Sequence, residues 1–198
     1  MINSGILADH KLVPTYLDLL EREHSAGDIR ETHLAMYCFW SGEKHLGTVD
    51  GVMSTKAGLM NGAEVVKVKY NPSVVNEKEL FANAAKQQCA DGVFSDDQRE
   101  LKVARKMGIS TNKRGKFRPD REPKYYTFNS DYRHLPMTGL QALKVNTALS
   151  KRESPESYLS PRQLEVLKEI QKGKLRKISA IDQDFGTTWN AILENVQP

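Results

Sequence analysis

Cysteine is scarce in this sequence, which has only Cys38 and Cys89 among its 198 residues. Two cysteines are too few for a disulfide-stapled scaffold, and neither belongs to a Cys-x-x-Cys pair or to a cysteine–histidine cluster. We therefore expect no structural zinc site, no other bound metal and no cofactor. Two separated cysteines are compatible with two free thiols or with one redox pair.

Long apolar runs are also missing. The N-terminus has no charged segment followed by an apolar one, because Pro14 and Asp18 interrupt the stretch from Leu12 to Leu20. No run approaches the roughly 18 apolar residues of a transmembrane helix, so we expect no membrane contact and a cytoplasmic location. The formal net charge is only +4, which is too small to indicate a nucleic-acid partner.

The composition is that of a globular protein, with 39% hydrophobic and 27% charged residues. Turn signals and apolar periodicity predict the order strand, helix, strand, strand, helix, strand and helix in the first half of the chain. This order predicts an α/β fold with a ferredoxin-like two-layer sandwich core and a helical C-terminal extension. The expected strands are 33–38, 52–58 and 64–70, and residues 89–94 are expected to be either a short strand or a link. The expected helices are 15–24, 42–46, 76–88, 95–107, 138–149 and 160–172.

Local signals mark the ends of several of these elements. The dipeptide Asn61-Gly62 predicts a tight hairpin turn between the second and third strands. Asn76 and Ser95 are expected to be helix N-caps, because each is followed three residues later by Glu or Gln. These signals predict where the elements of the core begin and end.

Composition divides the chain into three parts. We expect an N-terminal helical segment at residues 1–30, a core at 31–108, and a basic loop with a helical extension packed on that core at 109–198. Residues 111–123 are basic and contain proline, glycine and asparagine, which predicts an exposed loop. A cluster of aromatic residues follows at 124–135.

The segment from His33 to Gly47 contains the strongest candidate for a reactive group. Its apolar first half is typical of a buried strand, and the later Ser41-Gly42 pair can open a helix, which places Cys38 between a strand and a helix N-terminus. A helix N-terminus favours an anion, and the reactive form of cysteine is the thiolate. The alternative is that Cys38 is a small apolar residue in the core.

Four blocks of residues occur in order along the predicted core. They are Cys38-Phe39-Trp40 with Glu43; Gly51-Val52 with Ser54-Thr55, Gly58 and Met60; Ala63-Glu64-Val65-Val66 with Val68, Tyr70 and Pro72; and Ser95 to Ala104 with Asp96-Asp97-Gln98. In this order the blocks resemble the signature of the A-type peptide methionine sulfoxide reductase family. The resemblance covers about residues 32–107.

The resemblance implies a thiol oxidoreductase that reduces methionine S-sulfoxide, free or in peptides. Cys38 would be the nucleophile and Glu64 the acid that protonates the sulfoxide oxygen. Phe39 and Trp40 would hold the S-methyl group, and Tyr37 and Glu43 are the other expected substrate-binding residues.

The resemblance also implies how the enzyme is reset. Attack on the substrate leaves Cys38 as a sulfenic acid, which condenses with a second thiol to a disulfide. Cys89 is the only other thiol in the sequence, and it is expected to be this resolving cysteine unless it is a buried residue at a helix end. A thioredoxin-like reductant is then the expected partner.

The sequence departs from the family pattern around the substrate site. Tyr37 replaces a glycine, Cys89 stands where the family has a substrate-binding tyrosine, and the loop that brings another tyrosine is missing. Tyr37, or Tyr125, Tyr126 and Tyr132 from the extension, are the candidates to replace these tyrosines.

Two other functions stay open. The same fold could use its thiols on another oxidised substrate or on a soft metal ion, since thiolates suit such ions. The chain could instead be a non-enzymatic module that binds nucleic acid or protein, because Leu159 to Ile170 resembles the first helix of a helix-turn-helix. A capped amphipathic helix gives the same pattern.

Overall fold

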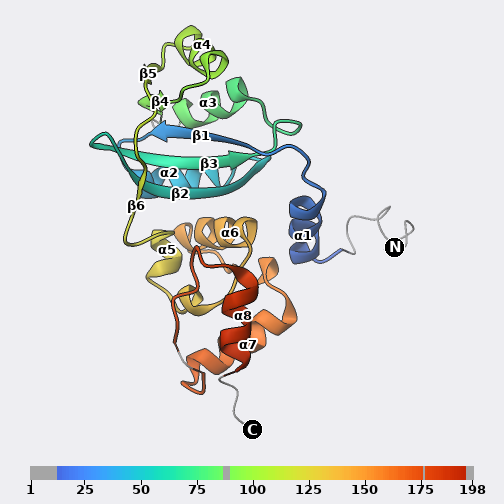
Figure 1. Cartoon of the computed structure of the whole chain (residues 1–198). Helices are drawn as coiled ribbons and strands as arrows, with labels where there is room; N and C mark the ends of the chain where they lie inside the picture. Colours follow the sequence, from blue (N-terminus) through green and yellow to red (C-terminus); the bar gives the residue numbers. More distant parts are fainter. Residues whose placement is uncertain (1–12, 87–89, 176, 195–198) are drawn as a thin grey trace.

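The computed structural model describes residues 13–86, 90–175 and 177–194, and a six-stranded sheet lies at its centre (Figure 1). Across the sheet the strands follow the order β5-β4-β1-β3-β2-β6. Their bounds are β1 (Arg30–Ala35), β2 (Val52–Met60), β3 (Ala63–Tyr70), β4 (Gly92–Phe94), β5 (Ser110–Asn112) and β6 (Arg118–Pro119).

The four middle strands have the ferredoxin-like arrangement. β4, β1, β3 and β2 lie side by side in antiparallel pairs. Helix α2 (Phe39–Leu46) follows β1, and helix α3 (Glu77–Lys86) follows β3. The main apolar core lies between the sheet and these helices, where Leu34 of β1 is buried with Leu46 and Phe81. The predicted fold class is confirmed, because both the chain order and the sheet order match this arrangement.

A tight turn at Asn61 and Gly62 sets the register of β2 against β3. Both residues have positive φ, 51° and 83°, as a two-residue type I′ hairpin turn requires. The predicted turn is therefore confirmed. It places Glu64 near the start of β3, where the amide of Met36 donates a hydrogen bond to the carbonyl oxygen of Glu64 (2.9 Å). This end of β3 thus lies beside the end of β1.

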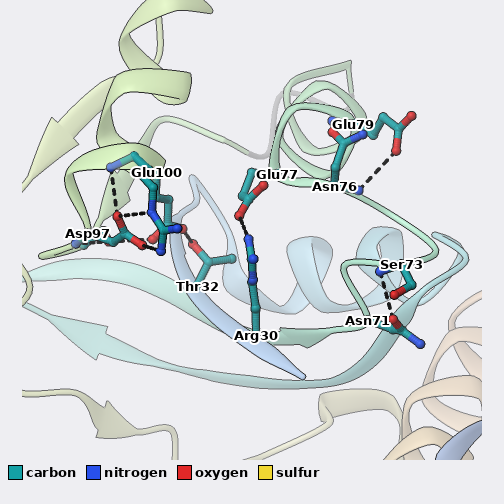
Figure 2. Close-up of polar contacts among 11 residues, drawn as sticks. Arg30, Thr32, Asn71, Ser73, Asn76, Glu77, Glu79, Asp97 and Glu100 are labelled. Carbon is teal, nitrogen blue, oxygen red and sulfur yellow. Dashed lines mark hydrogen bonds and ion pairs between the residues drawn. The ribbon is translucent and has the colours of Figure 1, made fainter. Parts of the chain in front are cut away.

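Figure 2 shows the polar contacts at the start of α3. The amide of Asn76 donates to Glu79 Oε2 (3.1 Å), and the amide of Glu79 donates to Asn76 Oδ1 (3.0 Å). This pair is the reciprocal cap predicted from the sequence, which is confirmed. Glu77 also forms an ion pair with Arg30 of β1 (2.5 Å), and this contact ties the helix to the sheet.

The predicted cap of helix α4 (Gln98–Lys106) is wrong. Asp97 is the N-cap, because its Oδ1 accepts a hydrogen bond from a backbone amide of the first turn (2.8 Å). The Ser95 hydroxyl is used elsewhere, since it accepts from the Asp97 amide (3.0 Å) and donates to Glu100. Glu100 also accepts from the hydroxyl of Thr32 on β1 (Figure 2), and burial raises the pKa of the Glu100 carboxyl group. Glu100 therefore links α4 to the sheet.

Two further expectations about element bounds are wrong. Helix α2 begins at Phe39 rather than at about residue 42, because Cys38 has the extended backbone of an N-cap residue (φ −141°, ψ 110°). Part of the expected loop at 111–123 belongs to strands, since β5 pairs in parallel with β4 and β6 pairs antiparallel with β2. Edge strands this short carry too few residues for a visible apolar periodicity.

The rest of the chain is mostly helical and lies below the sheet in Figure 1. Its elements are α1 (Thr15–Ser25), α5 (Tyr125–Phe128), α6 (Gly139–Ser150), α7 (Pro161–Gln171) and α8 (Phe185–Leu193), with the short 3-10 helices η1 (Asp131–His134) and η2 (Glu156–Tyr158). Helix α6 contacts both β2 and α2. A second apolar cluster lies inside this part, and α7 contributes Leu167 and Ile170 to it.

No helix within the described ranges is both long enough and apolar enough to cross a bilayer.

The face of the sheet opposite α2 and α3 is partly covered by the segment between β5 and β6 (Figure 1). The ring of Phe117 in this segment meets the His33 ring edge-on, with 5.8 Å between centroids. His33 is 2% exposed, and burial, together with nearby Arg114 and Lys67, lowers its pKa from 6.5 to about 4 against an opposing effect of Glu31. The imidazole is therefore neutral in the folded chain near neutral pH.

We expect the free energy of unfolding to fall as the pH drops from about 6.5 to about 4. In this window the unfolded chain binds a proton at His33 and the folded chain does not, so acid favours unfolding. The gap between 6.5 and about 4 corresponds to about 3 kcal/mol at most. Urea denaturation at about pH 7 and about pH 4 compares the wild type with His33→Gln, which stays neutral. Equal losses of stability in the two proteins would contradict this role of His33.

Candidate active site

Cys38 lies between β1 and α2, at the junction that the sequence predicts. It is the N-cap residue of α2, its thiol is free, and the residue is partly exposed. The first turn of α2 contains no acidic side chain, and the unpaired N–H groups of a helix N-terminus carry a partial positive charge. Such an end favours an anion, and cysteine reacts as its thiolate. The location of Cys38 therefore suits a reactive thiol.

Glu64 reaches the same helix end from β3. Its Oε2 accepts a hydrogen bond from the amide of Phe39 (2.8 Å), the residue next to Cys38. The two segments meet because β1 and β3 are paired, with Ala35 opposite Val65. This hydrogen bond anchors the half-buried Glu64 side chain at the helix end that follows Cys38.

Trp40, in the first turn of α2, contacts two residues from the C-terminal part of the chain. Its Nε1 donates a hydrogen bond to Asp120 Oδ2 (2.9 Å). The ring of Tyr125 stacks on the indole, with 4.2 Å between centroids and 24° between planes. The ring of Phe39 lies 5.5 Å from the indole in a tilted arrangement. Phe39, Trp40 and Tyr125 thus form an aromatic group at the start of α2, next to Cys38 in the sequence.

Glu43, further along α2, is the centre of a buried polar group. It is 0% exposed, and its Oε1 accepts hydrogen bonds from Lys124 Nζ (2.7 Å) and from the Thr55 hydroxyl (2.9 Å). Lys124 is also buried, has a left-handed backbone (φ 54°), and donates to the carbonyl oxygen of Thr55 as well. The carboxylate of Glu43 thus ties α2 to the start of α5 and has no exposed surface.

The other tyrosines expected in the site differ in how they lie relative to this group. The side chain of Tyr37 points into solvent, with the residue 87% exposed. Tyr126 meets Tyr125 edge-on at 5.4 Å, whereas Tyr132 packs against the second apolar cluster, where burial raises its pKa. Among the tyrosines considered as replacements, Tyr125 contacts the Trp40 ring. Cys89, the expected resolving thiol, lies outside the described residues.

Asp120, which bonds to Trp40, and Lys124, which pairs with Glu43, were not predicted from the sequence. Asp120 lies in the basic segment at 111–123 that is expected to be an exposed loop, and Lys124 directly follows that segment. One signal could have pointed to a cation such as Lys124. Glu43 lies on the apolar side of a short helix, and a buried carboxylate needs a positive or hydrogen-bonding partner.

Comparison with known proteins gives low but consistent similarity. No family model matches the chain. A stretch of 66 residues is 32% identical to the peptide methionine sulfoxide reductase MsrA of Lachnoclostridium phytofermentans, covering 25% of this chain and 40% of that protein. A longer match of 107 residues is 25% identical to the enzyme of the same name from Clostridium botulinum, covering 38% of this chain and 68% of that protein. The chain thus spans less than half of the first relative and about two thirds of the second.

Solved structures show a weak overall similarity. Mxr1 from Saccharomyces cerevisiae in an oxidised form has a TM-score of 0.38 and 22% identity over 48% of this chain and 77% of that one. The structure of Mxr1 in complex with Trx2 has a TM-score of 0.36 and 25% identity over 48% and 82%. The sequence relatives, rather than these structures, support the resemblance: part of the chain is similar to the A-type peptide methionine sulfoxide reductases.

Proposed function

We propose that the chain is a thiol-dependent oxidoreductase that reduces methionine S-sulfoxide, free or in peptides. The observation that carries this proposal is the position of Cys38 at the N-terminus of α2, with the Glu64 carboxyl group bonded to the next amide (2.8 Å). The proposed nucleophile and the proposed proton donor thus belong to one helix end, next to aromatic rings. The similarity to bacterial peptide methionine sulfoxide reductases supports the choice of substrate.

The chemistry requires one nucleophile and one acid. The Cys38 thiolate attacks the substrate at the sulfoxide, while the Glu64 carboxyl group protonates the sulfoxide oxygen. The sulfur–oxygen bond of the substrate breaks, a sulfur–oxygen bond to Cys38 forms, the thioether of methionine is released, and Cys38 becomes a sulfenic acid. Methionine sulfoxide gains two electrons, and Cys38 loses the same two.

The sulfenic acid must be reduced before a second turnover. Cys89, the other cysteine of the sequence, is the proposed thiol that attacks it, which releases water and leaves a Cys38–Cys89 disulfide. A thioredoxin-like dithiol partner then exchanges with this disulfide and returns both cysteines to thiols.

Reduction of a methionine sulfoxide peptide by the full chain, with dithiothreitol as the reductant, tests this function. We expect continuous formation of methionine from the S-epimer and little from the R-epimer, with dithiothreitol alone as the control. If neither epimer yields methionine above this control, the proposed substrate is wrong.

Glu64→Gln is expected to lower kcat by about a hundredfold or more, the usual range for the loss of a general acid. The amide oxygen of glutamine can still accept the hydrogen bond from Phe39, but the side chain cannot deliver a proton. The matched control is Glu31→Gln, because Glu31 is a half-buried glutamate of the same sheet that pairs with Lys67 and Arg114. Steady-state kinetics measure kcat for both variants. A Glu64→Gln enzyme with the kcat of the control would exclude Glu64 as the acid.

A further inference from the structure

We propose that Asp120 and Tyr125 are positioning residues that hold the Trp40 ring as one wall of the substrate site. Both residues lie beyond the region that resembles the reductase family, so the C-terminal part of the chain would complete the site. The inference rests on the proposed function, because it assigns Trp40 to contact with the substrate.

Backbone contacts with the sheet and with the next residue set the position of Asp120. It follows β6, which is paired with β2, and its amide donates to the carbonyl oxygen of Ala57 (2.9 Å). Its Oδ1 accepts from the amide of Arg121 (2.8 Å), which leaves Oδ2 to accept from Trp40 Nε1 (2.9 Å). A hydrogen bond to a charged acceptor is among the stronger ones in proteins. The sheet therefore sets the position of the indole edge.

The residues before and after Tyr125 in the sequence hold it in position. The preceding residue, Lys124, is anchored in the buried ion pair with Glu43 (2.7 Å). The following amide, that of Tyr126, donates to Asn146 Oδ1 of α6 (3.1 Å). These contacts hold the Tyr125 ring stacked on one face of the Trp40 indole, with 4.2 Å between the ring centroids. Stacked aromatic pairs of this kind favour one ring orientation over others.

The consequence for the reaction concerns binding rather than chemistry. An aromatic wall contacts the apolar methyl and sulfur of a substrate, and sulfur makes favourable contacts with aromatic rings. It neither attacks the sulfoxide nor moves a proton. Loosening Trp40 should therefore weaken substrate binding and leave the chemical step mostly intact.

Four variants and one control separate positioning from a general structural role. Asp120→Ala and Tyr125→Ala are expected to raise KM by about tenfold with less than about a twofold change in kcat. Asp120→Asn keeps one acceptor oxygen, which serves Trp40 Nε1 if the hydrogen bond from the Arg121 amide is given up, and Tyr125→Phe retains the stacked ring. Both should stay within about twofold of the wild-type KM. Arg121→Ala removes an exposed side chain from the same segment and should leave both constants unchanged.

Fluorescence provides a readout that does not depend on activity. The sequence has two tryptophans, so Trp189→Phe leaves Trp40 as the sole tryptophan, which can be excited selectively over tyrosine. In this background Asp120→Ala and Tyr125→Ala should shift the Trp40 emission, while Asp120→Asn and Arg121→Ala should not. Unchanged emission and unchanged KM in both alanine variants would overturn the inference. A wild type that does not reduce methionine sulfoxide at all would instead refute the proposed function, and the emission would still report whether the two residues hold Trp40.

Discussion

Replacing Cys38 with serine is expected to abolish methionine sulfoxide reduction, lowering the rate by about a thousandfold or more. Serine is nearly the same size and fits the same N-cap position, so the fold should not change. Its hydroxyl group is not ionised near neutral pH, however, and it cannot form a sulfenic acid. The rate of methionine formation with dithiothreitol measures this loss directly.

Cys89→Ser is the matched control for this prediction, because it removes the other thiol of the chain. With dithiothreitol it should remain active, since a small dithiol can reduce a sulfenic acid without a resolving cysteine. With a thioredoxin-like protein as the only reductant, its turnover should be lost. A Cys38→Ser protein that still turns over with dithiothreitol would mean that Cys38 is not the nucleophile.

Lys124→Met is expected to lower the free energy of unfolding by about 3 kcal/mol or more. The variant leaves Glu43 with a charged carboxylate in a position that is 0% exposed, and removes the cation at 2.7 Å from it. The penalty comes mainly from this uncompensated buried charge rather than from the loss of a favourable pair. Urea denaturation of the full chain measures the change.

Two further variants make this prediction specific. The double variant Glu43→Leu with Lys124→Met removes both charges and should recover most of the lost stability, as replacements of buried pairs often do. Lys56→Met breaks the partly exposed pair with Asp182 (3.2 Å) and should cost less than about 1 kcal/mol. If Lys124→Met were no more destabilising than Lys56→Met, the Glu43–Lys124 pair would not hold the extension to the core.

The parts of the fold that the sequence predicts correctly depend on local signals. Asn61 and Gly62 form the predicted turn because both adopt positive φ readily, and this preference belongs to the two residues themselves. The reciprocal cap of Asn76 and Glu79 spans three residues and also needs no distant partner. The position of Cys38 between a strand and a helix follows from the apolar run before it.

The contacts that sequence reasoning missed join residues far apart in the chain. Trp40 and Asp120 are separated by 80 positions, and Glu43 and Lys124 by 81. No local periodicity or turn signal links such pairs, because they meet only after β6 and α5 have packed against the core. The family resemblance could not supply them either, since it ends near residue 107. The wall of the candidate site contributed by the extension was therefore visible only in the structure.

A single turnover of the Cys89→Ser protein tests the central claim most directly. The reduced protein is mixed with one equivalent of methionine S-sulfoxide and a reagent that traps sulfenic acids, without any other reductant. Mass spectrometry then locates the label and chromatography counts the methionine formed. The account predicts one methionine per protein and a labelled sulfenic acid on Cys38. Methionine formed without a label on Cys38, or no methionine at all, would contradict it.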